Sequence, residues 1–313
     1  MKYSGIGGQA VIEGVMMRNG KQCAVAVRKP DGEIEVKKET VTSLRDRYAI
    51  ARVPVIRGIV SFVESLSSGM KTLNYSASFY EEEDYEPGKV EQFFTKIFGD
   101  KLESVLMGIT MVISVILALG IFMVLPFFLT NLMKGFLPSY SIRTLIEGII
   151  RVALFLIYIW LISKMEDIKR VFMYHGAEHK TINCLEHGED LTPENIKKYS
   201  RLHKRCGTSF LLIVMIVSIV VFMFIRVDSL VWKFVLRILL VPVVAGISYE
   251  FIRLAGRSDS KIVNTLSKPG LYLQYFTTRE PDEEMMEVAI KAVEGVFDWR
   301  EYLRAMHNGE LED

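Results

Sequence analysis

The chain has 313 residues, a formal net charge of +1 and a mean hydropathy of +0.25. Because 50% of its residues are hydrophobic and 24% are charged, we expect apolar and charged segments to alternate. The balanced charge excludes the basic excess of a nucleic-acid binder, so no nucleic-acid partner is expected. The cysteines Cys23, Cys184 and Cys206 form no CxxC pair, which favours a reducing, cytosolic setting over a disulfide framework.

The first 53 residues are expected to form a β-rich cytosolic region. Residues Gln22–Lys29 and Glu33–Glu39 alternate in polarity around a turn rich in Pro and Gly, which predicts a β-hairpin. Ahead of them, closely spaced glycines accompany Glu13 and Arg18. This stretch is either a loop that folds over a functional site and offers both side chains to a ligand, or a β-turn in which they pair.

The next region, residues 54–103, is expected to hold a helix and a linker. Residues Arg52–Ala77 mix apolar and charged residues, which is too polar to cross a bilayer but typical of a helix at the membrane interface or against a bundle. The acidic run Glu81–Glu86 is predicted to be a linker.

Four later segments are predicted to cross the membrane. Residues Ser104–Met133 and Gly207–Ile225 contain no ionisable residue and are long enough to span a bilayer. Residues Ile142–Ser163 and Ser229–Ile252 carry a few charges, which predicts spans with a polar face. In Ile142–Ser163, Glu147 lies four residues from both Arg143 and Arg151, so the three share a helix face, which predicts a structural ion pair.

Because backbone groups in lipid must be hydrogen-bonded internally, the expected fold class is mainly α. It is a polytopic bundle of about four transmembrane helices, with the small β-hairpin region at the N-terminus and a C-terminal cytosolic helix over Asp282–Val296. Residues 268–282, just before that helix, are predicted to form an ordered connector.

The distribution of cations predicts the orientation of the chain. The connection Lys164–Arg205 contains nine Lys or Arg residues, whereas the connections 130–141 and 226–228 are short and carry few. By the positive-inside rule, the long connection and both termini are expected on the cytosolic side of the lipid bilayer. The expected topology is two helical hairpins whose tight turns face outward.

The cytosolic connection contains the sequence YHGAEHKT, in which His175 and His179 lie four residues apart and Glu178 directly precedes the second histidine. On a helix both imidazoles project from one face and can hold a divalent metal ion, with zinc the expected choice. Glu178 could then act as general base on water whose pKa the ion lowers. The order HxxEH is similar to the inverted zinc-protease signature. Alternatively, these histidines only line a juxtamembrane helix and bond carbonyls or headgroups.

A mononuclear metal site needs a third protein ligand, and the sequence offers three candidates. His203 and Cys206 lie together where the chain re-enters the membrane. Glu250 lies near the cytosolic end of the last predicted span, where a carboxylate without a partner is costly. All three candidates stay open at this point.

These stretches resemble the YqhQ-like family of bacterial membrane proteins, domain of unknown function 1385, described as predicted metal-dependent enzymes. The resemblance extends along nearly the whole chain. It is carried by residues 7–18, by YHGAEHKTINC at 174–184, by HKRCGTSF at 203–210, by AGISYE at 245–250 and by residues 269–282. Lys204 departs from the family pattern, which more often has proline there. The resemblance implies a bacterial membrane protein with metal dependence, and it brings no substrate.

The leading hypothesis is a metal-dependent hydrolase of the bacterial inner membrane, whose site at the cytosolic face acts on a membrane-embedded peptide or lipid. The first alternative is a non-catalytic scaffold, assembly factor or chaperone. The second is a transporter, suggested by the charged residues within the spans, for which a homo-oligomer would be needed.

Six regions are therefore expected along the chain. They are the N-terminal β-rich region 1–53, the interfacial helix and linker 54–103, the first transmembrane hairpin 104–163, the cytosolic loop with HxxEH 164–206, the second transmembrane hairpin 207–252 and the C-terminal cytosolic region 253–313.

Overall fold

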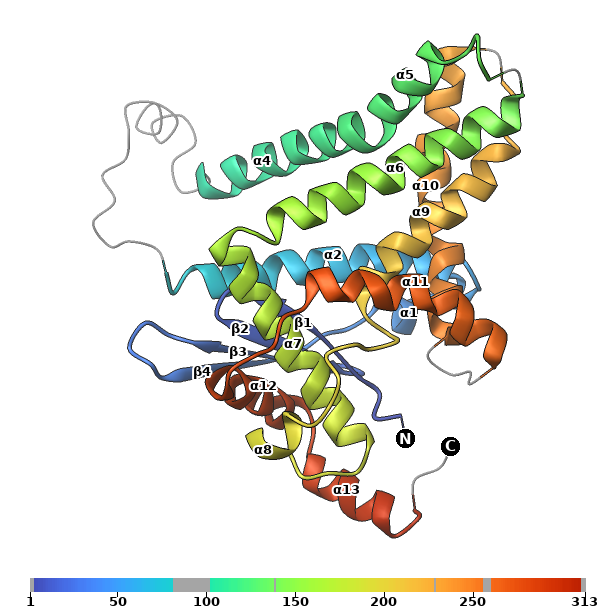
Figure 1. The fold of residues 1–313 in the computed structure, drawn as a ribbon. Helices are drawn as coiled ribbons and strands as arrows, with labels where there is room; N and C mark the ends of the chain where they lie inside the picture. Colours follow the sequence, from blue (N-terminus) through green and yellow to red (C-terminus); the bar gives the residue numbers. More distant parts are fainter. Residues whose placement is uncertain (1–2, 81–101, 138, 228, 256–259, 311–313) are drawn as a thin grey trace. The chain divides into compact units, whose positions relative to one another are not determined.

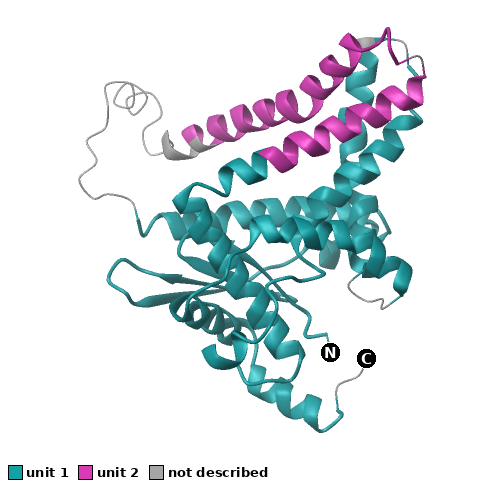
Figure 2. Ribbon diagram, viewed as in Figure 1, with its two compact units in different colours: residues 1–80, 158–313 teal, residues 81–157 magenta. Residues whose placement is uncertain are grey.

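The computed structural model describes residues 3–80, 102–137, 139–227, 229–255 and 260–310 (Figure 1). The chain divides into two compact units, one of residues 1–80 with 158–313 and one of residues 81–157 (Figure 2). The predicted acidic linker at Glu81–Glu86 lies outside the described residues.

An antiparallel sheet begins the first unit, with four strands in the described part of the chain. The strands β1 (Ile6–Val11), β2 (Gly14–Asn19), β3 (Gln22–Arg28) and β4 (Ile34–Thr40) lie in the sheet in chain order. The predicted hairpin is confirmed as β3 and β4. The glycine-rich stretch before it adds β1 and β2, because its apolar side chains are buried on both faces of the sheet.

Helices cover both faces of this sheet (Figure 1). On one face Val15 and Met17 share a core with α7 (Glu166–Glu186) and α12 (Glu283–Val296). On the other face Met16 and Val25 pack against Tyr75 of α2 (Ile56–Ala77). The first unit therefore contains a layered α/β core, which the predicted mainly helical bundle did not include.

The predicted C-terminal helix is confirmed as α12. The helix begins after Asp282, whose carboxylate accepts a hydrogen bond from the backbone N–H of Met285 at 2.8 Å. Its apolar side enters the sheet core. The remaining short helices are α1 (Leu44–Arg47), η1 (Ala49–Arg52), α8 (Pro193–Ile196) and α13 (Trp299–His307).

Three helices among the described residues are long and apolar enough to cross a membrane, which supports a membrane protein. The first is a continuous helical run through α4 (Leu102–Leu119), the π-helix η3 (Gly120–Val124) and α5 (Leu125–Leu132), and the others are α6 (Tyr140–Ile162) and α10 (Leu230–Ala255). The remaining predicted span, Gly207–Ile225, corresponds to α9 (Gly207–Met223). This helix is apolar but only 17 residues long.

Inside α6, Glu147 and Arg151 form the predicted ion pair, with 3.0 Å between the carboxylate and the guanidinium. Arg151 also donates a hydrogen bond from Nε to the carbonyl of Phe122 in η3 at 2.8 Å. Both charged side chains are buried. Pairing within an apolar helix lowers the cost of placing these charges in lipid.

The helices α2 and α10 cross at two glycines. A Cβ atom on Gly58 would lie 2.8 Å from the Cα of Gly246, and one on Gly246 would lie 2.5 Å from the carbonyl oxygen of Val55. Both distances are shorter than a carbon atom allows, so the crossing depends on the absence of side chains at these positions.

The predicted connector at residues 268–282 differs from the structure, because its first part belongs to α11 (Lys261–Thr277). Pro269 lies inside this helix, although proline lacks the backbone N–H. Tertiary packing maintains the helix: Gly270 lies directly against Ser209 of α9, and the buried side chain of Gln274 donates a hydrogen bond to the Ser209 hydroxyl at 2.8 Å.

Candidate metal centre

Helix α7 carries three predicted site residues. His175 and His179 lie one turn apart, with ring centroids separated by 4.3 Å, and Glu178 lies on the adjoining face. His179 is 1% exposed and Glu178 is 5% exposed. The helix is anchored by Ala177 and Ile182, which face the sheet core, so the histidine face is turned toward the segment before α9 and the end of α11.

Cys206 comes to the same place from the start of α9. Its Sγ lies 3.2 Å from Nε2 of His175, and it also caps α9 by accepting a hydrogen bond from the N–H of Thr208. One ligand atom from each of His175, His179 and Cys206 can be chosen so that all three lie within 4.8 Å of one another. Of the three candidates for the third ligand, the structure therefore brings Cys206 to the histidine pair.

Backbone carbonyls orient both imidazoles. Nδ1 of His175 donates a hydrogen bond to the carbonyl of Thr277 at 2.8 Å, and Nδ1 of His179 donates to the carbonyl of Arg201 at 2.6 Å. Because a carbonyl only accepts, each Nδ1 carries the proton and each Nε2 offers a lone pair when the ring is neutral. Nε2 of His179 is buried without a hydrogen-bond partner among the described residues.

The electrostatics of the group favour a thiolate. Burial alone would raise the pKa of the Cys206 thiol, but the neighbouring imidazoles of His175 and His179 hold that pKa well below its usual range. Burial lowers the pKa of His175, but the charge and hydrogen bond of Cys206, the charge of Glu178 and the Thr277 carbonyl together raise it to about 9. The thiolate is the form of cysteine that binds metal ions.

Glu178 lies against strand β1. A Cβ atom on Gly8 would lie 2.8 Å from Oε1 of Glu178, so only glycine leaves room for the carboxylate. Oε2 of Glu178 is buried without a hydrogen-bond partner among the described residues. Burial raises the pKa of Glu178, although His179 and His175 oppose this shift.

His203 lies next to the group of His175, His179 and Cys206 but is not one of its three members. Its ring centroid is 5.5 Å from that of His179, and its Nε2 is buried without a hydrogen-bond partner among the described residues. Burial holds the pKa of His203 well below its usual range, so the ring is neutral. Gln274 fixes its backbone by donating to the His203 carbonyl and accepting from its N–H, both at 2.8 Å.

The remaining predicted site residues have partners elsewhere. Glu250 pairs with Arg57 of α2 and is not a member of the histidine and cysteine group. Glu13 forms an ion pair with Arg170 of α7, and Arg18 donates from Nε to the carbonyl of Gly20 at 2.9 Å. The glycine-rich strand β1 does lie against the site, but it contributes Gly8 there instead of Glu13 or Arg18.

The donor set fits a zinc ion. Tetrahedral zinc with nitrogen and sulfur ligands at about 2.0 to 2.3 Å separates its ligand atoms by roughly 3.4 to 3.6 Å. The 3.2 Å between Cys206 Sγ and His175 Nε2 is close to this separation. Thiolate and imidazole suit zinc, whereas magnesium and calcium prefer oxygen ligands.

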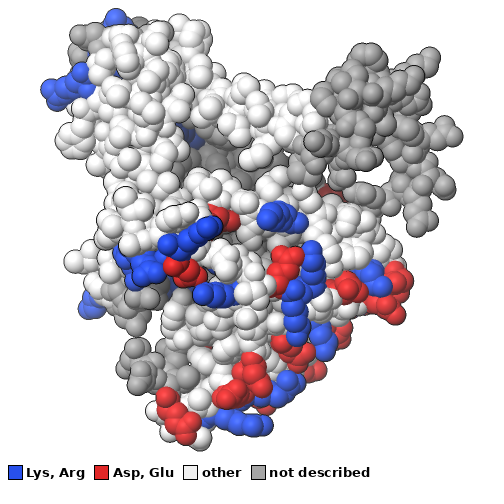
Figure 3. Space-filling model, turned by 180° about the vertical axis from the view of Figure 1, so that it is seen from behind, with Lys and Arg blue, Asp and Glu red and all other residues white. Residues whose placement is uncertain are grey.

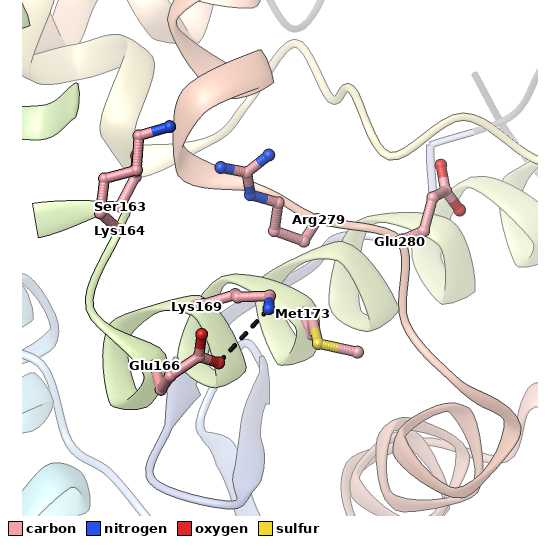
Figure 4. A pocket seen from close by; sticks show the side chains of 7 residues that line it. All are labelled: Ser163, Lys164, Glu166, Lys169, Met173, Arg279 and Glu280. Atoms are coloured by element: carbon pink, nitrogen blue, oxygen red, sulfur yellow. Dashed lines mark hydrogen bonds and ion pairs between the residues drawn. The ribbon is translucent and has the colours of Figure 1, made fainter. Parts of the chain in front are cut away.

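An open pocket of about 490 Å³ lies along the first half of α7 (Figure 4). Lys169 and Met173 line it from the side of α7 that is turned away from the histidines, and Lys169 pairs with Glu166 across 3.3 Å. Arg279 and Glu280 line it from the segment after α11. None of its lining residues belongs to the proposed metal group.

Together these features define a mainly helical chain with membrane-length helices and an α/β core that holds a buried histidine and cysteine group. The family model described as "Protein of unknown function (DUF1385)" matches residues 53–299. "Uncharacterized protein YqhQ" from Bacillus subtilis (strain 168) is 37% identical over 287 residues, covering 91% of this chain and 90% of the relative. The chain therefore belongs to the DUF1385 family. No solved structure matches it.

Sequence reasoning did not find the groups that frame the site. The carbonyls of Thr277 and Arg201 carry no side-chain signal, because any residue could supply them. Gly8 lies in the glycine-rich stretch and Gln274 in the predicted connector, but neither pattern indicates the contact that the residue makes at the site.

Proposed function

We propose that the protein is a metal-dependent hydrolase of the bacterial inner membrane, with a zinc ion held by His175, His179 and Cys206 and with Glu178 as general base. The observation that carries this proposal is the convergence of the three ligand atoms within 4.8 Å of one another, from two separate segments of the chain. When bound, the ion supplies Lewis acidity that activates water and polarises the scissile bond.

The residues around the ion have distinct roles in this proposal. Thr277 and Arg201 hold the imidazoles through their carbonyls, so that both Nε2 atoms face one point. Glu178 accepts the proton of the attacking water. Its raised pKa brings it closer to neutral pH, where a general base is most effective.

The place of the site supports a substrate at the membrane surface. Cys206 caps the apolar helix α9, so the proposed metal lies where α9 begins. A membrane-embedded peptide or a lipid could reach this level, which is the substrate class we propose.

We propose four spans with both termini in the cytosol: the shared core supports an even number of crossings, and the cation distribution favours the cytosolic side. The sheet, α7 and α12 contribute to one hydrophobic core, which requires them to lie on the same side of a membrane. The chain must then cross an even number of times between α7 and α12, so α9 crosses if α10 does. With 17 residues and a length of about 25 Å, α9 is at the lower limit for a span.

Replacing Glu178 with glutamine tests the hydrolase proposal. Glu178→Gln keeps the shape of the side chain and removes its capacity to accept a proton, so cellular complementation should be lost while the zinc content is kept. Glu194→Gln, which changes an exposed carboxylate on α8, should complement fully. Full complementation by Glu178→Gln would reject the general base.

The burial of the group supports a second candidate, a non-catalytic membrane factor in which the metal only fixes the core. Structural zinc sites have four protein ligands, whereas catalytic sites have three and an open position. His203 would be the fourth ligand. X-ray absorption spectroscopy of the zinc-loaded His203→Ala protein separates the two: an unchanged ligand shell favours the hydrolase, and loss of one nitrogen ligand favours the structural factor.

A further inference from the structure

A second pocket, of about 440 Å³, lies in the first unit and is lined by arginines. They are Arg45 of α1, Arg52 of η1, Arg57 of α2, Arg205 before α9 and Arg253 of α10. No carboxylate is among the described residues that line it. On the face seen from behind, Lys and Arg side chains gather around a few acidic ones over the part of the unit that carries α1 (Figure 3).

Two of the five arginines are neutralised by carboxylates. Arg57 forms an ion pair with Glu250, and Arg205 forms one with the buried Glu186 at 2.6 Å. These pairs hold two guanidinium groups in place and compensate their charge. The net charge of the pocket therefore depends on the other three arginines.

The other three arginines form no ion pair with a carboxylate in the described part of the chain. Arg45 donates to the hydroxyl of Tyr249 at 3.3 Å, and Arg52 donates to the carbonyl of Arg45 at 2.7 Å. Arg253 forms no hydrogen bond or ion pair with the described residues, although its charge acts on the carboxylate of Glu250. Three positive charges from three different elements therefore surround one cavity, which favours an anion there.

The chemistry of the lining selects a phosphate group. Guanidinium groups bind phosphate through paired N–H donors, and several of them together compensate its charge. Tyr3 and Tyr249 add hydroxyl groups, and the Arg205 guanidinium lies 4.4 Å over the Tyr3 ring, which keeps it in place.

The position of the pocket relates it to the membrane surface. Arg253 belongs to the last turn of α10, at the end of the candidate span Val231–Ala255. Basic pockets at the cytosolic ends of membrane helices lie at the level of lipid headgroups. We propose that this pocket binds a phosphate-bearing anion, supplied by an anionic phospholipid headgroup or by soluble phosphate. The inference does not rest on the proposed hydrolase function, because none of the three metal ligands lines the pocket.

The test measures stabilisation of the full chain, purified in a neutral detergent, by three probes at constant ionic strength. The probes are phosphatidylglycerol in mixed micelles, inorganic phosphate, and diacylglycerol, which lacks phosphate. The midpoint of thermal unfolding is followed against probe concentration, because a ligand that binds only the folded protein raises it.

Arg253→Gln is the main variant, because it removes a charge without breaking a hydrogen bond or ion pair within the described residues, and Glu250 keeps its ion pair with Arg57. We expect its half-saturating concentration to rise about tenfold, the effect of losing one charge-assisted contact. The double variant Arg52→Gln with Arg253→Gln should lose more. Arg304→Gln, which removes an exposed arginine of α13, is the charge-matched control and should respond as the unmodified chain does.

Each outcome bears on the proposal. A rise in the unfolding midpoint with phosphatidylglycerol alone identifies a lipid headgroup as the ligand. A rise with inorganic phosphate as well identifies soluble phosphate. Both outcomes support the site. Equal half-saturation in Arg253→Gln and Arg304→Gln would overturn it, as would a response to diacylglycerol as large as that to phosphatidylglycerol. If the double variant fails to fold, Arg253→Gln alone still decides.

Discussion

Each imidazole on α7 is held at Nδ1 by a carbonyl from a distant segment, Thr277 for His175 and Arg201 for His179. The spacing of the histidines predicts their common face, because a helix repeats every 3.6 residues. It does not predict which nitrogen points to the ligand, since that depends on where two distant backbones pass. The sequence likewise left Cys206, His203 and Glu250 as equal candidates, and tertiary packing distinguishes them.

The cysteines should differ in reactivity toward an alkylating reagent at pH 8. Burial raises the pKa of Cys184 to about 12, so the reactive thiolate is about one part in ten thousand and Cys184 should stay unmodified. Cys206 should be protected while zinc is bound and should react after a chelator is added. Mass spectrometry of peptides reads both sites. Alkylation of Cys206 at the same rate with and without chelator would contradict its role as a ligand.

At the scale of elements, local patterns located most helices but not their crossings. The amphipathic pattern of residues 52–77 predicts α2, and the structure packs this helix against α10 at Gly58 and Gly246. Whether α2 also touches lipid stays a prediction. Residues 261–277 were harder, because Pro269 suggests a break, and the continuous α11 is explained only by tertiary contacts of Gly270 and Gln274 with Ser209.

The glycine crossing gives a prediction on stability. In Gly246→Ala the new Cβ would lie 2.5 Å from the Val55 carbonyl, so the two helices must separate, and we expect a loss of about 1 to 3 kcal/mol in the free energy of unfolding. Gly108→Ala is the matched control, since a Cβ there meets no atom within 4 Å. Thermal unfolding in detergent measures both variants. Equal midpoints would show that the crossing tolerates a side chain.

For the whole molecule, the sequence predicts the alternation of membrane helices and polar regions, but it did not predict the α/β core. That core joins the N-terminal sheet with α7 and α12, segments far apart in the chain, and no local pattern reports their contact. This core restricts the membrane topology in a way that hydropathy does not, because all its parts must lie on one side of the membrane.

Reporter fusions test whether all parts of the core lie on one side of the membrane. If α9 and α10 both cross, reporters fused at the N-terminus, after Gly188 and at the C-terminus should all report the cytosol, and a fusion after Arg226 should report the outer side. If the 17-residue α9 does not cross while α10 does, the C-terminal reporter would lie on the side opposite to the reporter after Gly188. That result would be incompatible with the shared core.

The most direct test of the proposed metal centre is the metal content of the purified full chain, measured by elemental analysis. We expect about one zinc ion per chain, because one potential ligand atom from each of His175, His179 and Cys206 lies within 4.8 Å of the other two. His179→Ala and Cys206→Ala should lose it. His187→Ala, which changes a histidine just after α7 that is outside the group, should keep it. Metal-free protein that complements fully, or zinc retained in both ligand variants, would contradict the account.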